Sequence, residues 1–409
     1  MIVSKVLVIF LFLYPFELLS AESMVVFNLE VDPASPEVGY FSTDTSWIGE
    51  FSLLAPRQQG RLPEDGVTIE CFSDESWFEV VYEKPITCDR LEWEVEFLPA
   101  SGFDLDISEQ KSFYSSEGWW VLFEWGLTPR IENIETITVC GSISQENNDE
   151  WCQPLPERNK PPLIFMMGKA AAEFREQQTS FRIFTDSPGE ALVDGAHKNT
   201  LISQYSYLAG LFSDQEASDQ YAELAWVGID KKDEVLGGAA GATGFVSNYA
   251  LENGAIDVIS RERLFWISGH ELFHTLSTYP YDLWVSESLA HYYGYKSLIQ
   301  DSQISQNPID DWNENKGRMP NSMVGLYQAH FEVTKNRNMS YYGLFYAKGA
   351  AFWYEVDSLL MNSGSSLDGY LQLISESVDS EGKLGTEFIQ AVSAIVGEDQ
   401  VLQLIQNYL

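Results

Sequence analysis

The feature that most constrains this chain is a five-residue motif near its middle, His270-Glu271-Leu272-Phe273-His274. On an α-helix, residues four apart lie on the same face, so the two imidazoles can point toward one ion. The residues around the motif, from 261 to 276, are mostly apolar, which favours a helix packed against a core. Histidines are costly to bury there unless their nitrogens are bonded. The motif therefore predicts a helix that presents two metal ligands.

The type of ligand indicates which metal is bound. Neutral imidazoles suit zinc, and a catalytic zinc site keeps one coordination position open for water. Zinc lowers the pKa of its bound water to about 7, so that a neighbouring carboxylate can accept the proton. Glu271 lies one residue round the helix from the ligand face, within reach of that water. The pattern predicts one Zn²⁺ ion, with Glu271 as the general base.

Such a site needs a third protein ligand, and two carboxylates compete for this role. Glu287 lies thirteen residues after His274, in the segment 283–290, which has the character of a second helix. Residues 278–282 include Pro280 and supply the turn between the two helices. Asp282 is the alternative ligand. We favour Glu287, because the turn must be complete before the chain can return to the metal.

Charge limits the partners of the chain. The formal net charge is −37, from 61 acidic and 24 basic residues among 409. Nucleic acids and anionic membranes are therefore excluded as partners on electrostatic grounds. The acidic residues are spread along the chain, which is typical of a solvated surface.

The N-terminal sequence indicates export. Residues 1–21 combine Lys5, a short apolar run and the small residue Ala21 before a cleavage point, which predicts a signal peptide. No later stretch is long and apolar enough to span a membrane. We therefore expect a secreted or periplasmic protein with no integral membrane domain after signal removal. Its oligomeric state is left open.

The four cysteines agree with export. Their even number predicts disulfides, for which three pairings exist. We favour the two local pairings, which join the residues nearest in sequence: Cys71 with Cys88 and Cys140 with Cys152. A zinc cluster is the weaker interpretation, because there is no C-x-x-C motif.

The fold class expected is α+β, in two domains. Residues 22–162 contain short runs of β-branched and aromatic residues separated by turn-forming ones, which predicts an all-β domain that holds both disulfides. Residues 163–409 form the second domain, with strands at 180–184, 224–229 and 256–259 and a helix at 200–212. After the motif the pattern is mostly helical, with helices at 341–361, 367–378, 386–396 and 399–409.

A run of small residues precedes the motif, at Gly237, Gly238, Ala239 and Ala240. Its glycines do not have the spacing of a phosphate-binding loop. One interpretation is a flexible loop. The other is an exposed strand edge, whose small side chains let a peptide approach and pair with the main chain. We lean toward the second, which makes these four residues candidates for substrate binding.

Three segments together resemble the gluzincin metallopeptidases, most closely the M61 glycyl aminopeptidase family and more distantly the M1 aminopeptidases. The first runs from His270 to Thr275. The second, residues 283–294, is similar to the L-W-x-x-E-G-x-x-x-Y-Y pattern of that family. The third, residues 346–350, is similar to its Y-x-K-G-A pattern. The resemblance covers roughly residues 165–409.

The resemblance implies a thermolysin-like catalytic domain behind the N-terminal β domain. It implies that His270, His274 and Glu287 bind zinc, that Glu271 is the general base, and that Tyr346 donates a hydrogen bond to the oxyanion of the tetrahedral intermediate. Such a donor lowers the barrier because it is aimed at developing charge.

The sequence also departs from the family. In the relatives the glycine-rich segment carries a glutamate that helps to hold the free amino terminus of the substrate, whereas Ala240 stands at that position here. Ser288 replaces a glycine. His291 follows Glu287 by one helical turn. It could support one of the metal ligands or be a surface histidine, and we favour the surface interpretation.

Together these observations predict a zinc-dependent metallopeptidase that hydrolyses peptides or proteins, and the resemblance implies an aminopeptidase. The alternative is a catalytically altered gluzincin that serves as a secreted binding or scaffold protein. The change at Ala240 favours that alternative, whereas the complete set of His270, Glu271, His274 and Glu287 argues against it.

Overall fold

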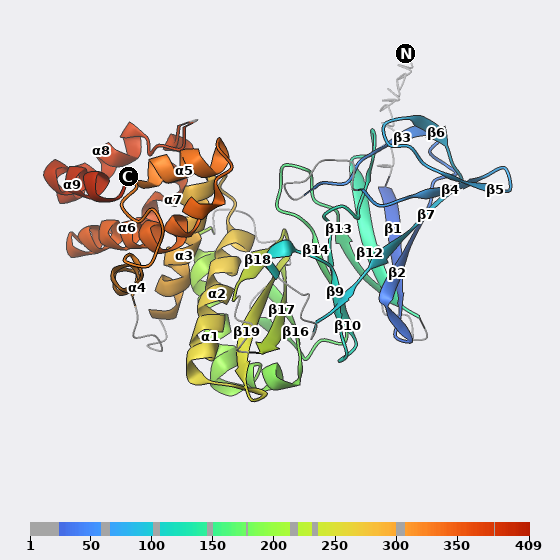
Figure 1. Ribbon diagram of the computed structural model, residues 1–409, viewed down its shortest axis with the longest axis horizontal. Coiled ribbons are helices and arrows are strands. Elements are labelled where there is room, and N and C mark those ends of the chain that lie inside the picture. The colour runs from blue at the N-terminus through green and yellow to red at the C-terminus, as the bar shows by residue number, and fades with distance from the viewer. Residues whose placement is uncertain are drawn as a thin grey trace, which may run out of the picture.

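The computed structural model describes residues 24–58, 66–100, 107–144, 150–176, 179–212, 220–230, 236–299, 307–379 and 381–409. The predicted signal peptide, residues 1–21, lies outside the described residues. The chain has an N-terminal β-sheet domain followed by a second domain that becomes helical toward its C-terminus (Figure 1). No helix in the described ranges has the length and apolar character needed to cross a bilayer.

The N-terminal part is built from three sheets. The seven-stranded sheet has the order β13-β12-β1-β2-β7-β4-β5, with β1 parallel to β12 and the other neighbours antiparallel. Side chains of β1 alternate between buried and exposed, as expected for a strand with one face on a core. The strands of this sheet are β1 (Met24–Asp32), β2 (Ser35–Asp44), β4 (Glu70–Ser73), β5 (Ser76–Glu79), β7 (Arg90–Glu96), β12 (Thr136–Ile143) and β13 (Glu150–Pro154).

Two smaller sheets complete this part. One has the order β14-β10-β9-β8, and the other β11-β3-β6. Their strands are β3 (Glu50–Leu54), β6 (Pro85–Thr87), β8 (Leu98–Pro99), β9 (Phe113–Ser115), β10 (Trp119–Phe123), β11 (Arg130–Ile131) and β14 (Ile164–Gly168). Thus β14, which follows residue 162, still pairs with β10 of the N-terminal part.

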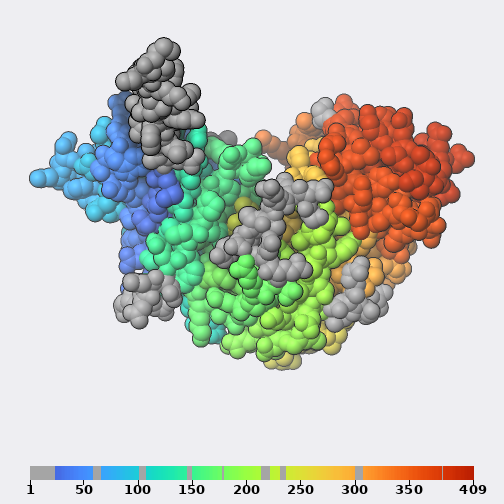
Figure 2. All heavy atoms as spheres, turned by 180° about the vertical axis from the view of Figure 1, so that it is seen from behind, coloured from blue at the N-terminus to red at the C-terminus, as the bar shows by residue number. Residues whose placement is uncertain are grey.

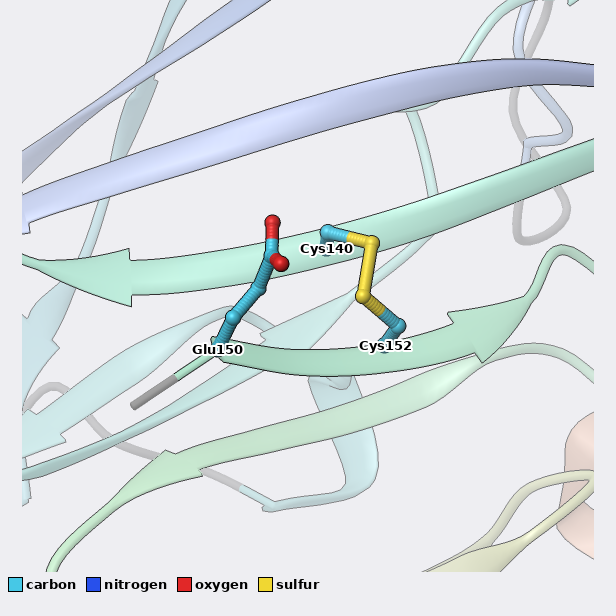
Figure 3. Close-up of side chains that lie close together, drawn as sticks. All are labelled: Cys140, Glu150 and Cys152. Atoms are coloured by element: carbon cyan, nitrogen blue, oxygen red, sulfur yellow. A yellow bond between two sulfur atoms is a disulfide. The ribbon is translucent and has the colours of Figure 1, made fainter. Parts of the chain in front are cut away.

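Both disulfides lie in this domain, with the local pairings that the sequence favours. Cys71 joins Cys88, and Cys140 joins Cys152. The second bond links residues that face each other on the neighbouring strands β12 and β13 (Figure 3). Because each bond closes a loop, both restrict the unfolded chain and stabilise the domain.

The second domain begins with a mixed sheet of order β15-β16-β17-β19-β18, in which β16, β17 and β19 are parallel. A short strand, β20, pairs with β19. The strands are β15 (Ala172–Glu176), β16 (Thr179–Thr185), β17 (Gln220–Asp230), β18 (Gly238–Ala240), β19 (Gly244–Glu252) and β20 (Ala255–Ile256).

Helices pack against one face of this sheet and the β domain packs against the other. Leu224 and Trp226 of β17 pack in the same core as helices α1 (Gly195–Gly210) and α2 (Val258–Leu276). Ala225 and Val227, on the opposite face, share a second core with Trp119 of β10. The β domain therefore packs directly against the sheet that carries β18 and is not loosely tethered to it.

Helices form the rest of the second domain. They lie at the opposite end of the molecule from the β domain, with the mixed sheet between them (Figure 2). They are α3 (Leu283–Ile299), α4 (Pro308–Asn315), α5 (Leu326–Thr334), α6 (Gly343–Asn362), α7 (Leu371–Ser377), α8 (Thr386–Val396) and α9 (Glu398–Tyr408). Short 3₁₀ helices are η2 (Ile107–Glu109), η3 (Ser187–Leu192), η5 (Met339–Tyr341) and η6 (Leu367–Tyr370).

One predicted strand is wrong. Of residues 256–259 only Ile256 lies in a strand, as the last residue of β20, because Asp257 caps α2 by accepting a hydrogen bond from the backbone N–H of Ser260 at 2.6 Å. An aspartate side chain at this position accepts a hydrogen bond from a backbone N–H group that the first turn of a helix otherwise leaves unpaired. The β-branched residues Val258 and Ile259 then start the helix.

Candidate metal centre

Helix α2, which carries the H-E-x-x-H motif, packs closely against α3. A Cβ atom added at Gly294 of α3 would lie 2.9 Å from the backbone oxygen of Trp266 on α2. A Cβ atom added at Gly269 would lie 2.7 Å from Nε2 of Gln204 on α1. The glycines thus permit close packing of the three helices. This packing brings Glu287, in the second turn of α3, next to the histidines of α2.

His270, His274 and Glu287 converge on one point. The Nε2 atoms of the two histidines are 3.2 Å apart. Oε2 of Glu287 lies 3.5 Å from Nε2 of His270 and 3.6 Å from Nε2 of His274. Tetrahedral zinc, at about 2.0–2.1 Å from each ligand, requires its ligand atoms to be roughly 3.3 Å apart. The observed separations fit this requirement, so the three side chains could hold a zinc ion and leave a position for water.

Asp282, the alternative third ligand, is not a member of this group. Its negative charge acts on His330, whose pKa is lowered mainly by burial and is partly restored by Asp282. Glu287 is therefore the carboxylate that the fold places beside the two histidines.

Electrostatics favour the metal-binding protonation state at His270 and Glu287 and oppose it at His274. Burial lowers the pKa of His270, which keeps its imidazole neutral. Burial opposes ionisation of Glu287, but the two histidines outweigh it and leave the pKa of Glu287 lowered. Burial also lowers the pKa of His274, but Glu287 outweighs it and leaves that pKa raised. Zinc binding to His274 therefore releases a proton at low pH.

Glu271 lies beside this group and is held there by the strand β18. Burial raises the pKa of Glu271 to about 8. The positive charge of a zinc ion acts in the opposite direction, toward the ionised form. A Cβ atom added at Gly238 would lie 2.5 Å from Oε1 of Glu271 and 2.6 Å from its Cγ. Only glycine leaves room for the carboxylate at this point of the strand.

Helix α6 contributes Tyr346 to the same place. The centroid of its ring is 5.7 Å from that of His270. Burial raises the pKa of Tyr346, and the charge of Glu287 acts in the same direction. The hydroxyl therefore stays protonated and can donate a hydrogen bond. Helix α6 approaches α3 at Gly349, where an added Cβ would lie 2.4 Å from Cβ of Ser288. Ser288 itself accepts a hydrogen bond from Nε1 of Trp353 at 2.7 Å.

Tyr342 is a residue that sequence reasoning missed. It lies one helical turn before Tyr346, and its ring centroid is 5.5 Å from that of Tyr346. Burial raises the pKa of Tyr342, and the charge of Glu287 and a hydrogen bond to it raise that pKa further. The i, i+4 spacing from Tyr346 could have revealed it.

The interpretation of His291 as a surface residue is wrong. His291 is buried, with 6% of its area exposed. Its ring centroid is 5.1 Å from Tyr346 and 5.7 Å from His270. Because His291 lies one helical turn after Glu287, it points to the same side of α3 as that carboxylate. It contacts the rings of both residues and also lines the smaller of the two cavities beside the centre.

Two adjoining cavities open onto the centre. The smaller, of about 710 Å³, is lined by α2, α4 and α6 and by the start of β18. The larger, of about 1370 Å³, is lined by β18, the loop between α2 and α3, and residues around Pro161. Gly238, His270, Glu271 and Tyr346 line both. The four candidate substrate-binding residues, Gly237 to Ala240, are divided between the two cavities.

A second group of potential ligands lies in the β domain, where Cys140, Glu150 and Cys152 are close together (Figure 3). The two sulfur atoms form a disulfide of 2.04 Å, so no thiolate is free to bind a metal. In the part of the chain that the structure describes, the group on α2 and α3 is therefore the stronger candidate.

Comparisons with known proteins identify the fold. No protein-family model matches the chain, and no curated protein matches its sequence. Among solved structures, an aminopeptidase N family protein from Idiomarina loihiensis superposes with a TM-score of 0.54 at 13% sequence identity, covering 94% of this chain and 73% of that one. An M1 zinc metallopeptidase from Deinococcus radiodurans gives 0.47 at 13% identity, covering 93% and 92%.

The first of these likenesses shows that the chain, with its N-terminal β-sheet domain followed by a helical domain, shares its fold with 73% of that aminopeptidase N family protein. The particular resemblance to the M61 family stays a prediction.

Proposed function

We propose that this protein is a zinc-dependent metallopeptidase that hydrolyses peptide bonds. The observation that carries the proposal is the convergence of His270, His274 and Glu287 at the separations of a tetrahedral zinc site, with Glu271 alongside. The site opens onto cavities large enough for a peptide. The two disulfides agree with a secreted or periplasmic location.

In this proposal His270, His274 and Glu287 would hold one zinc ion, which would acidify a water molecule and polarise the scissile carbonyl. Glu271 takes the proton of the water and delivers it to the leaving amine. Its burial beside Gly238 keeps the carboxylate in one place. Tyr346 donates a hydrogen bond from its hydroxyl group to the developing oxyanion. The main chain of Gly237 to Ala240 pairs with the main chain of the substrate.

Replacement of Tyr346 by phenylalanine tests the role of the hydroxyl. We expect kcat to fall by a factor of about 10² to 10³ with little change in KM, because the donor acts in the transition state. Steady-state kinetics on one peptide measure both constants. Tyr354→Phe is the matched control, because it removes a hydroxyl from the same helix about two turns further on, at a residue that does not line either cavity. A loss confined to KM would contradict this role.

Removal of the metal tests the function itself. We expect the purified protein to cleave peptides from a mixed library, to lose this activity after dialysis against a chelator, and to regain it when zinc is added. Mass spectrometry of the library detects the products. If the protein binds zinc and cleaves nothing, the alternative of a secreted binding or scaffold protein is favoured. If dialysis against the chelator does not reduce peptide cleavage, the proposal is wrong.

A further inference from the structure

The candidate centre lies where the two cavities meet and not at the end of either. Both cavities reach His270, Glu271 and Tyr346. The larger one, at about 1370 Å³, exceeds the roughly 300–1,000 Å³ that is usual for a small-ligand site. A peptide bond held at the centre therefore has room for chain on both of its sides.

Strand β18 and its flanking residues connect the two cavities. Leu236 and Gly237 line the smaller cavity, Gly238 lines both, and Ala239 and Ala240 line the larger. On one side β18 pairs with β19, and it ends the strand order of the described sheet. An extended peptide that adds to such an edge follows the strand. It would run from one cavity into the other and pass Glu271 at Gly238.

The charged side chains that line the larger cavity, Lys160 among them, give the amino terminus of a substrate no anchor there. An ammonium group removed from water needs an anionic partner. Among the described residues that line this cavity, the acidic ones are Glu271 and Glu287, the proposed base and metal ligand. Ala240, which stands where the resembling families carry a glutamate, contributes only a methyl group to the wall.

The smaller cavity is no better suited to a terminal ammonium group. Besides Glu271, its described lining includes Asp311, together with the guanidinium groups of Arg263 and Arg318. The charge of Arg263 acts on Asp311 and favours the ionised carboxylate, whose pKa is raised mainly by burial. A terminal ammonium group would meet two cations there.

From this arrangement we infer that the enzyme cleaves internal peptide bonds of an extended chain that passes through the cleft along β18. This inference rests on the proposed function and adds the mode of cleavage. The scissile carbonyl lies opposite Gly238, with residues of the substrate along Ala239 and Ala240 on one side and along Leu236 and Gly237 on the other.

End-blocked peptides test the inference. A peptide that the wild type cleaves is made with both ends free, with an acetylated N-terminus, with an amidated C-terminus, and with both ends blocked. For each form the cleaved bond is identified by mass spectrometry, and kcat/KM is measured. Glu271→Gln protein purified in the same way controls for contaminating peptidases.

We expect the same internal bond to be cleaved in every form, with kcat/KM values that agree within about threefold, because an uncontacted terminal charge contributes little. A loss of about tenfold or more on acetylation would indicate an anchored amino terminus and overturn the inference. The same loss on amidation would indicate a carboxylate held by a cation of either cavity, Lys160 or the pair Arg263 and Arg318, and would also overturn it. If no form is cleaved, the proposed function fails, and the inference fails with it.

Discussion

Glu271→Gln protein is expected to hold zinc as the wild type does and to cleave peptides about 10² to 10⁴ times more slowly, the contribution usual for a general base. The amide has the shape of the carboxylate but cannot accept the proton of the water. Glu271 is not one of the three converging ligands, so the metal should stay in place. The decrease should appear in kcat and in kcat/KM alike, because the interaction is lost in the transition state.

A matched variant controls for the loss of one negative charge from α2. Glu262→Gln makes the same chemical change on the same helix, at a residue that does not line either cavity. It should retain wild-type rates. Zinc content is measured by elemental mass spectrometry on the samples used for kinetics. Full activity of Glu271→Gln would show that another group takes the proton.

Gly238→Ala is expected to reduce activity almost as strongly, although it adds a single methyl group. The new Cβ would lie 2.5 Å from Oε1, 2.6 Å from Cγ and 2.8 Å from Cδ of Glu271, so the glutamate side chain must move. A displacement of about 1 Å at a reacting centre costs on the order of 10²-fold in rate. Zinc content and folding should be unchanged, because none of those three contacts is to a metal ligand.

Gly210→Ala controls for a glycine-to-alanine change elsewhere in the domain. Gly210 is the last residue of α1, is exposed, and has nothing within 4 Å of an added Cβ. It should leave kcat and the melting temperature close to those of the wild type. Wild-type kinetics for Gly238→Ala would contradict the described position of Glu271 against β18.

The sequence predicts those parts of the candidate centre that depend only on local chain geometry. The four-residue spacing of His270 and His274 requires a helix for its chemistry, and a turn of suitable length returns Glu287 to them. The structure brings these three residues together. The strand edge was similarly open to prediction, since Gly238 to Ala240 form β18 at the end of the described sheet order, whereas its role in substrate binding stays a prediction.

Features that depend on tertiary packing were missed. The burial of His291 follows from the close contact of α2 with α3, which no local pattern displays. The contact of Tyr342 with Glu287 depends on how α6 packs against α3, although the i, i+4 spacing from Tyr346 offered a signal for it. The burial of β10 on both of its faces arises because one face meets the core of the β domain and the other meets the mixed sheet. Strand propensity at Val258 and Ile259 was overridden by the helix cap at Asp257.

The central claim is that His270, His274 and Glu287 hold one zinc ion. The most direct test is the zinc content of the purified wild type and of Glu287→Ala after exhaustive dialysis, measured by elemental mass spectrometry. We expect one zinc per chain in the wild type and less than about a tenth of that in the variant, because two imidazoles alone form an incomplete site. A wild type without zinc, or a variant that keeps its full complement, would show that these three residues do not form the zinc site.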